Sequence, residues 1–574
     1  MYDCVIKGAT VVDGSGAARY QADVAIQDGR IVEIGKVTGA SRETIEADGL
    51  VLSPGFIDPH THYDAQLLWD PFASPSNLHG VTSVIGGNCG FTLAPLAEGD
   101  ADYIRRLMAM VEGMPLVALE TGIEWNWSTF GEYLQRLDGR IGVNAGFLVG
   151  HCALRRSVMG PAGTGNPASP DEIARMVAVL HEAIEAGGLG FSSSQSYTHQ
   201  DGDQNPVPSR YAARDEMLAL ATAAGEHPGT TLEFITDGCL ERFSDAEVDL
   251  MIAMSLAARR PLNWNVMGVS AAKRERHEHQ LSAGSRAKEA GAKIVALTMP
   301  MLGGLKMSFR DFCALHSLPG FKEILTLPVS GRIQALRDDE TRRWARQRAE
   351  TVSGALAGLT RWGQYEIGET FSEANRGLTG RIVEEVARER NQAPFDTLME
   401  IVLNDDLRTD LWPVPGDDDT DSWKLRVDIW RDERALIGGS DAGAHLDRMC
   451  GARYPTEFLR RVVREMQLIS LEEAIHRMTD APARLFGLRQ RGRVETGWHA
   501  DLVLFDPQRI ASEPIRTKND LPGNSERLFA GAVGIERVFV NGRSIVVAGE
   551  PTGELPGVVL RSGRETETVE VPGR

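Results

Sequence analysis

Eight short apolar runs alternate with segments of helical pattern along most of the 574-residue chain. Strands that alternate with helices are typical of a parallel α/β core, and eight such units predict a (β/α)8 TIM-like barrel. One connecting helix is well marked, with Ser169 as its N-cap, Pro170 as its first residue and Glu172 as the capping-box partner. The expected strands are 50–57, 83–86, 143–149, 189–192, 230–235, 261–266, 292–297 and 435–438.

The two ends of the chain have a different pattern, that of short strands joined by turns. Asp28-Gly29 and Asn541-Gly542 each lie between apolar runs, which is a typical hairpin signal. We therefore expect a small β-sandwich domain built from residues 1–52 and 481–574. The barrel would occupy 53–480, with a helical insertion at about 300–430, a stretch that is too long for a loop.

Composition excludes several classes of protein. The net charge of -19 argues against a nucleic-acid partner, because binding phosphates needs a basic face. No run approaches the ~18 apolar residues of a membrane span, and the N-terminus lacks the features of a signal peptide. The six cysteines are scattered without a Cys-x-x-Cys pair, so they are not a disulfide framework. We expect a cytoplasmic protein, which could form a homo-oligomer.

Polar residues that can bind metal follow three of the expected strands. His60 and His62 end the run 50–57, and alternation along a strand would point both rings to one side, making half a metal site. Cys89 stands among glycines after the second run, where we expect an accessible thiolate, a strong soft ligand. Asp441 follows the last run. Each alone also fits an ordinary loop, tight turn or helix cap, but their shared place at strand ends favours a metal site.

This combination indicates metal-assisted hydrolysis. A Zn²⁺ ion lowers the pKa of bound water from ~16 to about 7, which gives hydroxide at neutral pH. The hydroxide would attack a carbonyl carbon polarised by the metal. Asp441 would act as general base and then as general acid, returning the proton to the leaving nitrogen.

The chain resembles the amidohydrolase superfamily and, within it, the D-aminoacylase (N-acyl-D-amino-acid deacylase) family. The resemblance covers nearly the whole chain and implies that His60 and His62 hold one metal, that Cys89 bridges two sites and that Asp441 is both ligand and catalytic acid/base. It implies one or two Zn²⁺ ions and a small-molecule amide substrate. The motifs that carry it are 7–14, 56–62, 87–90, 149–151, 189–192, 380–382, 440–441, 481–483 and 497–504.

The chain departs from this family at the second metal site. Family members have histidines at the ends of the fifth and sixth barrel strands, and a lysine that binds substrate closely follows the second of them. Here Glu233 and Asn265 stand at these positions, and the lysine is missing. Glu233 could be an oxygen ligand. Asn265 is at best a weak ligand and could instead hydrogen-bond water or substrate, and both residues could also simply pack at the barrel mouth.

Four further residues are candidates for supporting roles. Arg453 follows Asp441 roughly where the family has a substrate-binding arginine, which can clamp a carboxylate; Arg448 competes for this role. Tyr197 could contact substrate from its loop. His151 ends the third strand, and we expect it to contact the metal ligands rather than the metal itself.

The leading hypothesis is a Zn-dependent hydrolase of a linear amide, an N-acyl amino acid of D configuration. The missing lysine motivates an alternative, a hydrolase of a cyclic amide, carbamate or ester. The substitutions Glu233 and Asn265 motivate a third hypothesis, a barrel whose decayed site now serves as a scaffold.

Overall fold

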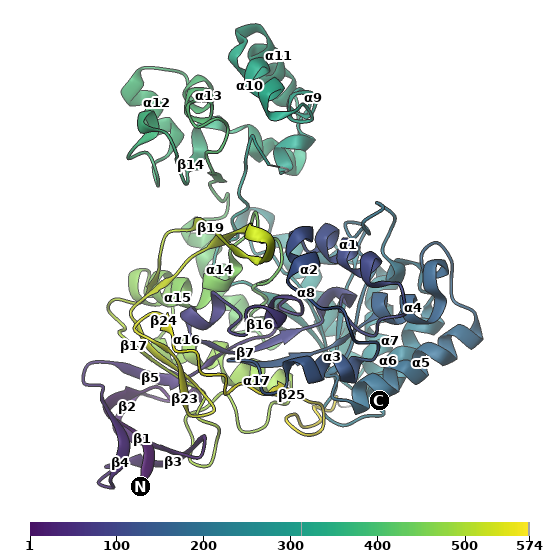
Figure 1. Cartoon of the computed structure of the whole chain (residues 1–574), viewed down its shortest axis with the longest axis vertical. Coiled ribbons are helices and arrows are strands. Elements are labelled where there is room, and N and C mark those ends of the chain that lie inside the picture. The colour runs from purple at the N-terminus through teal and green to yellow at the C-terminus, as the bar shows by residue number, and fades with distance from the viewer. Residues whose placement is uncertain (312, 572–574) are drawn as a thin grey trace.

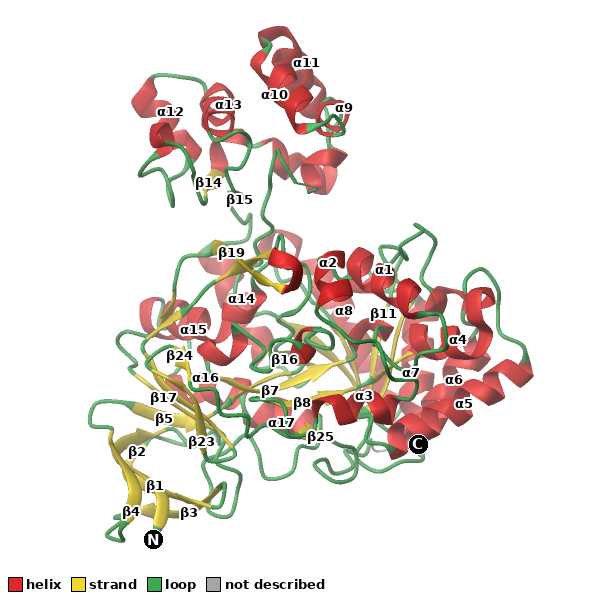
Figure 2. Ribbon diagram, viewed as in Figure 1, coloured by secondary structure: helices red, strands yellow, loops and turns green. Residues whose placement is uncertain are grey.

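Parallel strands form a barrel at the centre of the computed structural model, which describes residues 1–311 and 313–571 (Figures 1 and 2). Two strands, β8 and β9, share the third position: β8 pairs with the second strand and β9 with the fourth. The resulting eight positions confirm the (β/α)8 prediction. The barrel strands are β6 (Phe56–Asp58), β7 (Val81–Gly86), β8 (Asn144–Phe147), β9 (Val149–Gly150), β10 (Gly190–Ser194), β11 (Thr231–Ile235), β12 (Leu262–Trp264), β13 (Ile294–Thr298) and β16 (Ala435–Ile437).

The barrel closes between its first and last strands, beyond their regular ends. Thr61 and Ala442 form a parallel bridge there. The His62 amide donates to the Ala442 carbonyl at 2.7 Å, and the Asp441 amide donates to the His60 carbonyl at 3.2 Å. Closure therefore places the two segments that carry these polar side chains directly beside each other.

Helices surround the barrel (Figure 2). The predicted start of α5 is confirmed, because the Ser169 hydroxyl accepts from the Glu172 amide and Pro170 is the first helical residue. The helices of this layer and of the barrel ends are α1 (Ala101–Val111), α2 (Leu116–Thr121), α3 (Phe130–Leu137), α4 (His151–Met159), α5 (Pro170–Glu185), α6 (Arg214–Gly225), α7 (Asp245–Ala258), α8 (Arg274–Glu289), α14 (Thr420–Trp430), α15 (Tyr454–Phe458), α16 (Leu471–Met478) and α17 (Asp480–Leu485).

One end of the barrel interior is filled by apolar side chains. Strand residues such as Ile57, Ile85 and Leu297 share a buried cluster with Leu485 and Phe486 at the end of α17. This packing leaves the opposite, carboxyl end of the strands for polar groups, as in other barrels of this kind.

Both ends of the chain form one further sheet. β5 pairs in parallel with β1 and antiparallel with β17, which joins the N-terminal strands to the C-terminal ones. The sheet has a separate core that includes Ile6, Leu52 and Phe539. Its strands are β1 (Tyr2–Val11), β2 (Tyr20–Gln27), β3 (Arg30–Gly35), β4 (Ser41–Glu46), β5 (Val51–Pro54), β17 (Leu502–Phe505), β22 (Ile535–Val540), β23 (Arg543–Val547) and β24 (Glu550–Pro551).

The C-terminal segment does not belong entirely to this sheet, which corrects the expected range 481–574. β25 (Val559–Leu560) pairs in parallel with barrel strand β8. The hairpin of β19 (Arg516–Leu521) and β20 (Ser525–Phe529) lies on the barrel side, where the Leu528 amide donates to the Leu446 carbonyl at 2.7 Å. The short pair β18 (Ala511–Ser512) and β21 (Ala532–Val533) completes this part of the chain.

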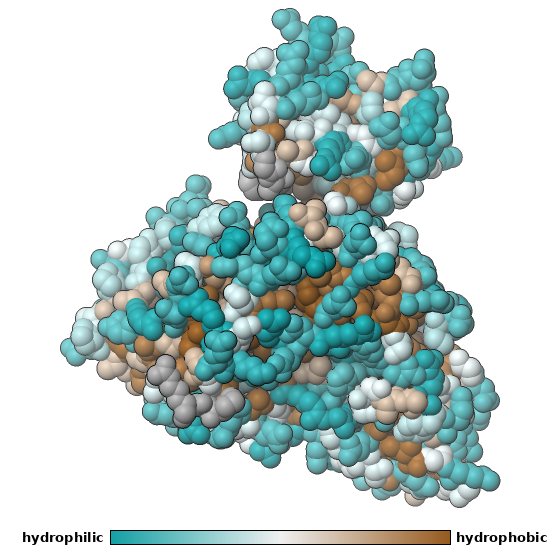
Figure 3. Space-filling model, turned by 180° about the vertical axis from the view of Figure 1, so that it is seen from behind, coloured by the Kyte–Doolittle hydropathy of each residue, from teal (hydrophilic) through white to brown (hydrophobic). Residues whose placement is uncertain are grey.

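The insertion is a lobe that projects from the barrel between β13 and α14 (Figure 1). It has its own buried cluster, which includes Phe321, Trp362 and Leu398. Seen from behind, it is a separate and largely hydrophilic mass (Figure 3). Its elements are α9 (Phe321–Leu325), α10 (Val329–Arg337), α11 (Asp339–Ala349), β14 (Tyr365–Ile367), α12 (Val383–Arg390), α13 (Pro394–Asn404) and β15 (Leu411–Pro413).

The lobe is narrower in sequence than the expected range 300–430. Its two connections meet where Met307 and Leu411 exchange backbone hydrogen bonds and Lys306 Nζ lies 3.2 Å from Asp410 Oδ1. α14 follows this neck and packs against β16, so it is a barrel helix. Within the described residues, the helices are all too short or too polar to cross a membrane.

Candidate metal centre

His60 and His62 lie just beyond β6, on the segment that closes the barrel. Both side chains are fully buried, and their rings meet edge to face with centroids 5.3 Å apart. The regular strand ends at Asp58, so the two rings meet on an irregular extension of β6. The prediction that they point to one side agrees with this contact.

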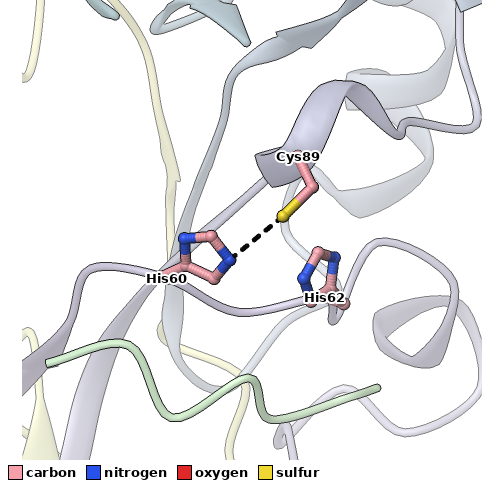
Figure 4. Close-up of side chains that lie close together, drawn as sticks. All are labelled: His60, His62 and Cys89. Atoms are coloured by element: carbon pink, nitrogen blue, oxygen red, sulfur yellow. Dashed lines mark hydrogen bonds between the residues drawn. The ribbon is translucent and has the colours of Figure 1, made fainter. Parts of the chain in front are cut away.

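Cys89 lies in the short turn Asn88–Gly90 after β7 and points toward His60 (Figure 4). Its Sγ is 3.5 Å from His60 Nε2. The ligand atoms of Cys89, His60 and His62 all lie within 4.8 Å of one another, and no other such group of three was found in the described part of the chain. Ligand atoms this close to one another can share a single cation.

The expectation that Cys89 is accessible is wrong, since its exposed fraction is 8%. Neighbouring backbone packs closely on the turn: a Cβ at Gly87 would lie 2.1 Å from the Leu148 carbonyl oxygen. Burial raises the pKa of the Cys89 thiol well above its usual value, and the nearby Glu233 carboxyl raises it further. A cation would oppose both effects, because metal coordination deprotonates a thiol.

Asp441 follows β16 and faces both histidines. Its Oδ1 is 3.2 Å from His62 Nε2 and 3.7 Å from His60 Nε2. Burial alone would raise the pKa of Asp441, but the hydrogen bond and positive charge of His62, with smaller contributions from His445 and His60, hold it well below its usual range. The structure thus brings together His60, His62, Cys89 and Asp441, a set of nitrogen, sulfur and oxygen donors that suits Zn²⁺.

Glu233 and Asn265 lie on the other side of the barrel mouth, on β11 and after β12. Glu233 Oε2 accepts a 2.8 Å hydrogen bond from the Cys89 amide, so the carboxyl supports the turn that holds the thiol. Glu233 Oε1 and Asn265 Oδ1 are buried without a hydrogen-bond partner in the described chain. Burial raises the pKa of Glu233 to about 8. Neither residue joins the compact group of three, but both offer free acceptor oxygens.

Two residues near Asp441 were missed by sequence reasoning. Glu112 at the end of α1 places Oε1 3.4 Å from His62 Nδ1, and its carbonyl accepts a hydrogen bond from the His445 amide. His445 Nε2 is 3.7 Å from Asp441 Oδ2. Burial raises the pKa of Glu112 to about 7. The spacing of Asp441 and His445 was a visible signal, whereas the sequence around Glu112 carried none.

The two candidate arginines lie in different places. Arg453 Nη1 faces Glu457 Oε2 at 3.7 Å, along the start of α15. Burial lowers the pKa of His445, and the positive charge of nearby Arg448 lowers it further. Arg448 Nη2 would also lie 3.3 Å from a Cβ built at Gly113, beside Glu112. The surroundings therefore favour Arg448 over Arg453 as the arginine nearest to Asp441.

Tyr197 and His151 are not members of the group of three. The Tyr197 side chain is 54% exposed on the loop after β10. His151 is buried at the start of α4, with Nδ1 2.9 Å from Ser193 Oγ and Nε2 2.8 Å from Glu216 Oε1. Since both of its nitrogens have partners, His151 has none left for a metal.

Comparison with known proteins identifies the family of this chain. The model of the amidohydrolase family matches residues 43–546. The chain is 30% identical to N-acyl-D-aspartate deacylase of Alcaligenes xylosoxydans xylosoxydans over 98% of this chain and 95% of that one. It is 27% identical to the D-aminoacylase of the same organism, over 97% of each chain.

A solved structure extends the comparison to three dimensions. The crystal structure of N-acyl-D-glutamate deacylase from Bordetella bronchiseptica, complexed with zinc and a phosphonate inhibitor, is 25% identical, with a TM-score of 0.63. That match covers 98% of this chain and 100% of the other. The resemblance to D-aminoacylases is confirmed, and the chain belongs to the amidohydrolase family.

Proposed function

We propose that this protein is a zinc-dependent amidohydrolase that cleaves the linear amide bond of an N-acyl amino acid of D configuration. The observation that carries the proposal is the buried group of His60, His62 and Cys89, with Asp441 facing both rings. The relatives named above, deacylases of N-acyl-D-aspartate and N-acyl-D-glutamate and a D-aminoacylase, support the substrate class.

The four residues would hold the ion. When bound, zinc supplies a Lewis acid for the amide carbonyl and lowers the pKa of water. The compact set supports one ion; a second would depend on the free oxygens of Glu233 and Asn265.

Asp441 is the group that moves a proton. Its carboxylate lies beside both histidines, so Oδ1 or Oδ2 can accept a proton from the attacking water and return it to the leaving nitrogen. Arg448, on the same loop, can supply positive charge for the carboxylate of the substrate.

The test combines metal analysis with a substrate panel. Purified protein is stripped with a chelator, reloaded with Zn²⁺ and assayed on N-acyl-D-amino acids, their L enantiomers, a hydantoin and an ester. We expect activity that depends on zinc and favours the D-acyl compounds. Preference for the hydantoin or ester would replace the proposed substrate class, and a folded, metal-free protein that stays inactive with Zn²⁺ would support the scaffold hypothesis.

A further inference from the structure

Glu112 connects two loops of the metal centre, although it lies outside every motif of the chain. It follows α1, and its side chain is 3% exposed. Its carboxyl faces His62, and its carbonyl binds the main chain at His445. A buried carboxylate against a metal-binding histidine has a known physical role, which is to fix the ring and its tautomer.

We propose that Glu112 is a positioning residue that orients His62 for the metal. The proposal rests on the function proposed above, since it assumes that His62 is a ligand. His62 Nε2 faces Asp441 Oδ1 at 3.2 Å, on the side of the cluster, while Nδ1 faces Glu112 Oε1 at 3.4 Å on the other. With the proton on Nδ1, toward Glu112, the lone pair of Nε2 points at the metal.

Within the described residues, His62 Nδ1 is buried and has no hydrogen-bond partner. Glu112 Oε1 faces this nitrogen at 3.4 Å, slightly beyond the usual range of about 2.7–3.2 Å for an N–H···O hydrogen bond. Glu112 is therefore the acceptor available to this nitrogen.

His60 provides an internal contrast. Its Nδ1 is also buried without a hydrogen-bond partner in the described chain, but its contacts with acidic groups run through Nε2, to Asp441. The two histidines thus differ at Nδ1, which faces the Glu112 carboxyl in His62 but has no such contact in His60. Removal of the Glu112 charge should act through His62 and leave His60 in place.

The main chain of Glu112 has a separate role. Its carbonyl accepts from the amide of His445, a residue with φ of 50°, in the left-handed region that non-glycine residues rarely adopt. This hydrogen bond holds the loop after Asp441. Glu112→Gln keeps the backbone and the shape of the side chain, so it separates the charge from the backbone contact.

The experiment measures zinc binding by competition with a chromogenic chelator, and the visible spectrum of the Co²⁺-loaded protein as a report on the ligand set. Glu112→Gln is expected to weaken zinc binding roughly 10–100-fold, as removal of such outer partners does, and to change the Co²⁺ spectrum. The matched control is Glu120→Gln, at an exposed glutamate of α2, which should leave both unchanged. Thermal unfolding of the metal-free proteins checks that the variants are folded.

A double-mutant cycle tests whether Glu112 affects zinc binding through His62. In a His62→Ala background, Glu112→Gln should cost no further zinc affinity, because the ring through which it acts is gone. If Glu112→Gln does not fold, Glu112→Asp, which retracts the carboxyl by one methylene, is expected to weaken zinc binding in the same way.

The outcomes separate this inference from the proposed function. If the wild type binds zinc and the Glu112 variant binds it as tightly with an unchanged Co²⁺ spectrum, the positioning role is wrong and the function stands. An effect that persists fully in the His62→Ala background also overturns it. If the wild type binds no zinc, both proposals fail.

Discussion

The two sides of the barrel mouth present different kinds of ligand atom. On one side, His60, His62 and Cys89 bring nitrogen and sulfur within 4.8 Å of one another. On the other side, Glu233 and Asn265 present single oxygens that no described group satisfies. The first set suits zinc, whereas isolated oxygen ligands suit harder cations or water. We therefore propose that the first side holds the metal and that Glu233 and Asn265, on the second, are where this chain departs from the pattern expected of D-aminoacylases.

The largest expected effect is on turnover, after replacement of Asp441 on the side with the nitrogen and sulfur ligands. Asp441→Asn removes the proton acceptor, so we expect turnover of the zinc-loaded enzyme to fall by roughly 10²–10⁴-fold. Steady-state kinetics with the best D-acyl substrate measures it, and Asp421→Asn at an exposed position of α14 is the control. Unchanged turnover would mean that the proton passes through another group.

Replacement of Cys89 tests whether the sulfur is responsible for tight zinc binding on this side. Cys89→Ser replaces a soft ligand with a hydroxyl that stays protonated, and we expect zinc affinity to fall by more than about 100-fold, beyond the effect of outer partners. Chelator competition gives the affinity. Cys4→Ser, a buried cysteine of β1 in the other domain, should have no effect on zinc. Equal affinities in both variants would place the metal elsewhere.

Replacement of Glu233 tests the side with the oxygen ligands, and the pH dependence of stability is the measurement. Its expected effect on zinc affinity is the smallest of the three, less than the roughly 10-fold loss that follows removal of a hydrogen-bond partner of a metal ligand. Burial raises the pKa of the Glu233 carboxyl from 4.5 to about 8. Between these values the folded protein binds more protons than the unfolded one, so the Glu233 contribution makes metal-free protein less stable as pH rises.

Glu233→Gln removes this dependence while keeping an acceptor for the Cys89 amide. We expect the metal-free variant to match the wild type near pH 4 and to exceed its free energy of unfolding at pH 9 by on the order of a few kcal/mol. Urea unfolding measures the difference, with the exposed Glu241→Gln as control. A variant that is less stable than the wild type at pH 9 would show that the charged carboxylate is stabilised in the fold.

Much of the side with the nitrogen and sulfur ligands could be predicted, because each of its residues follows an apolar strand in the sequence. His60, Cys89 and Asp441 stand at the ends of the first, second and last strands, and barrel topology alone brings such positions to one end. The accessibility of Cys89 could not be predicted, because it depends on the backbone of Leu148 packing against the turn.

Other features had no local signal. Two arginines, Arg448 and Arg453, follow Asp441 closely, and only the path of the loop distinguishes the one beside His445 from the one beside Glu457. The pairing of β25 with β8 is equally hidden, since a two-residue strand leaves no periodic pattern.

The sequence by itself therefore determined the barrel, the domain of paired chain ends and the side chains that can bind metal, because periodicity and strand-end motifs are local properties of the chain. Tertiary structure alone decided that Glu112 faces His62, that Glu233 supports the Cys89 turn and that the lobe ends before α14. These contacts join residues from separate strands and helices, so their geometry exists only once the barrel has closed.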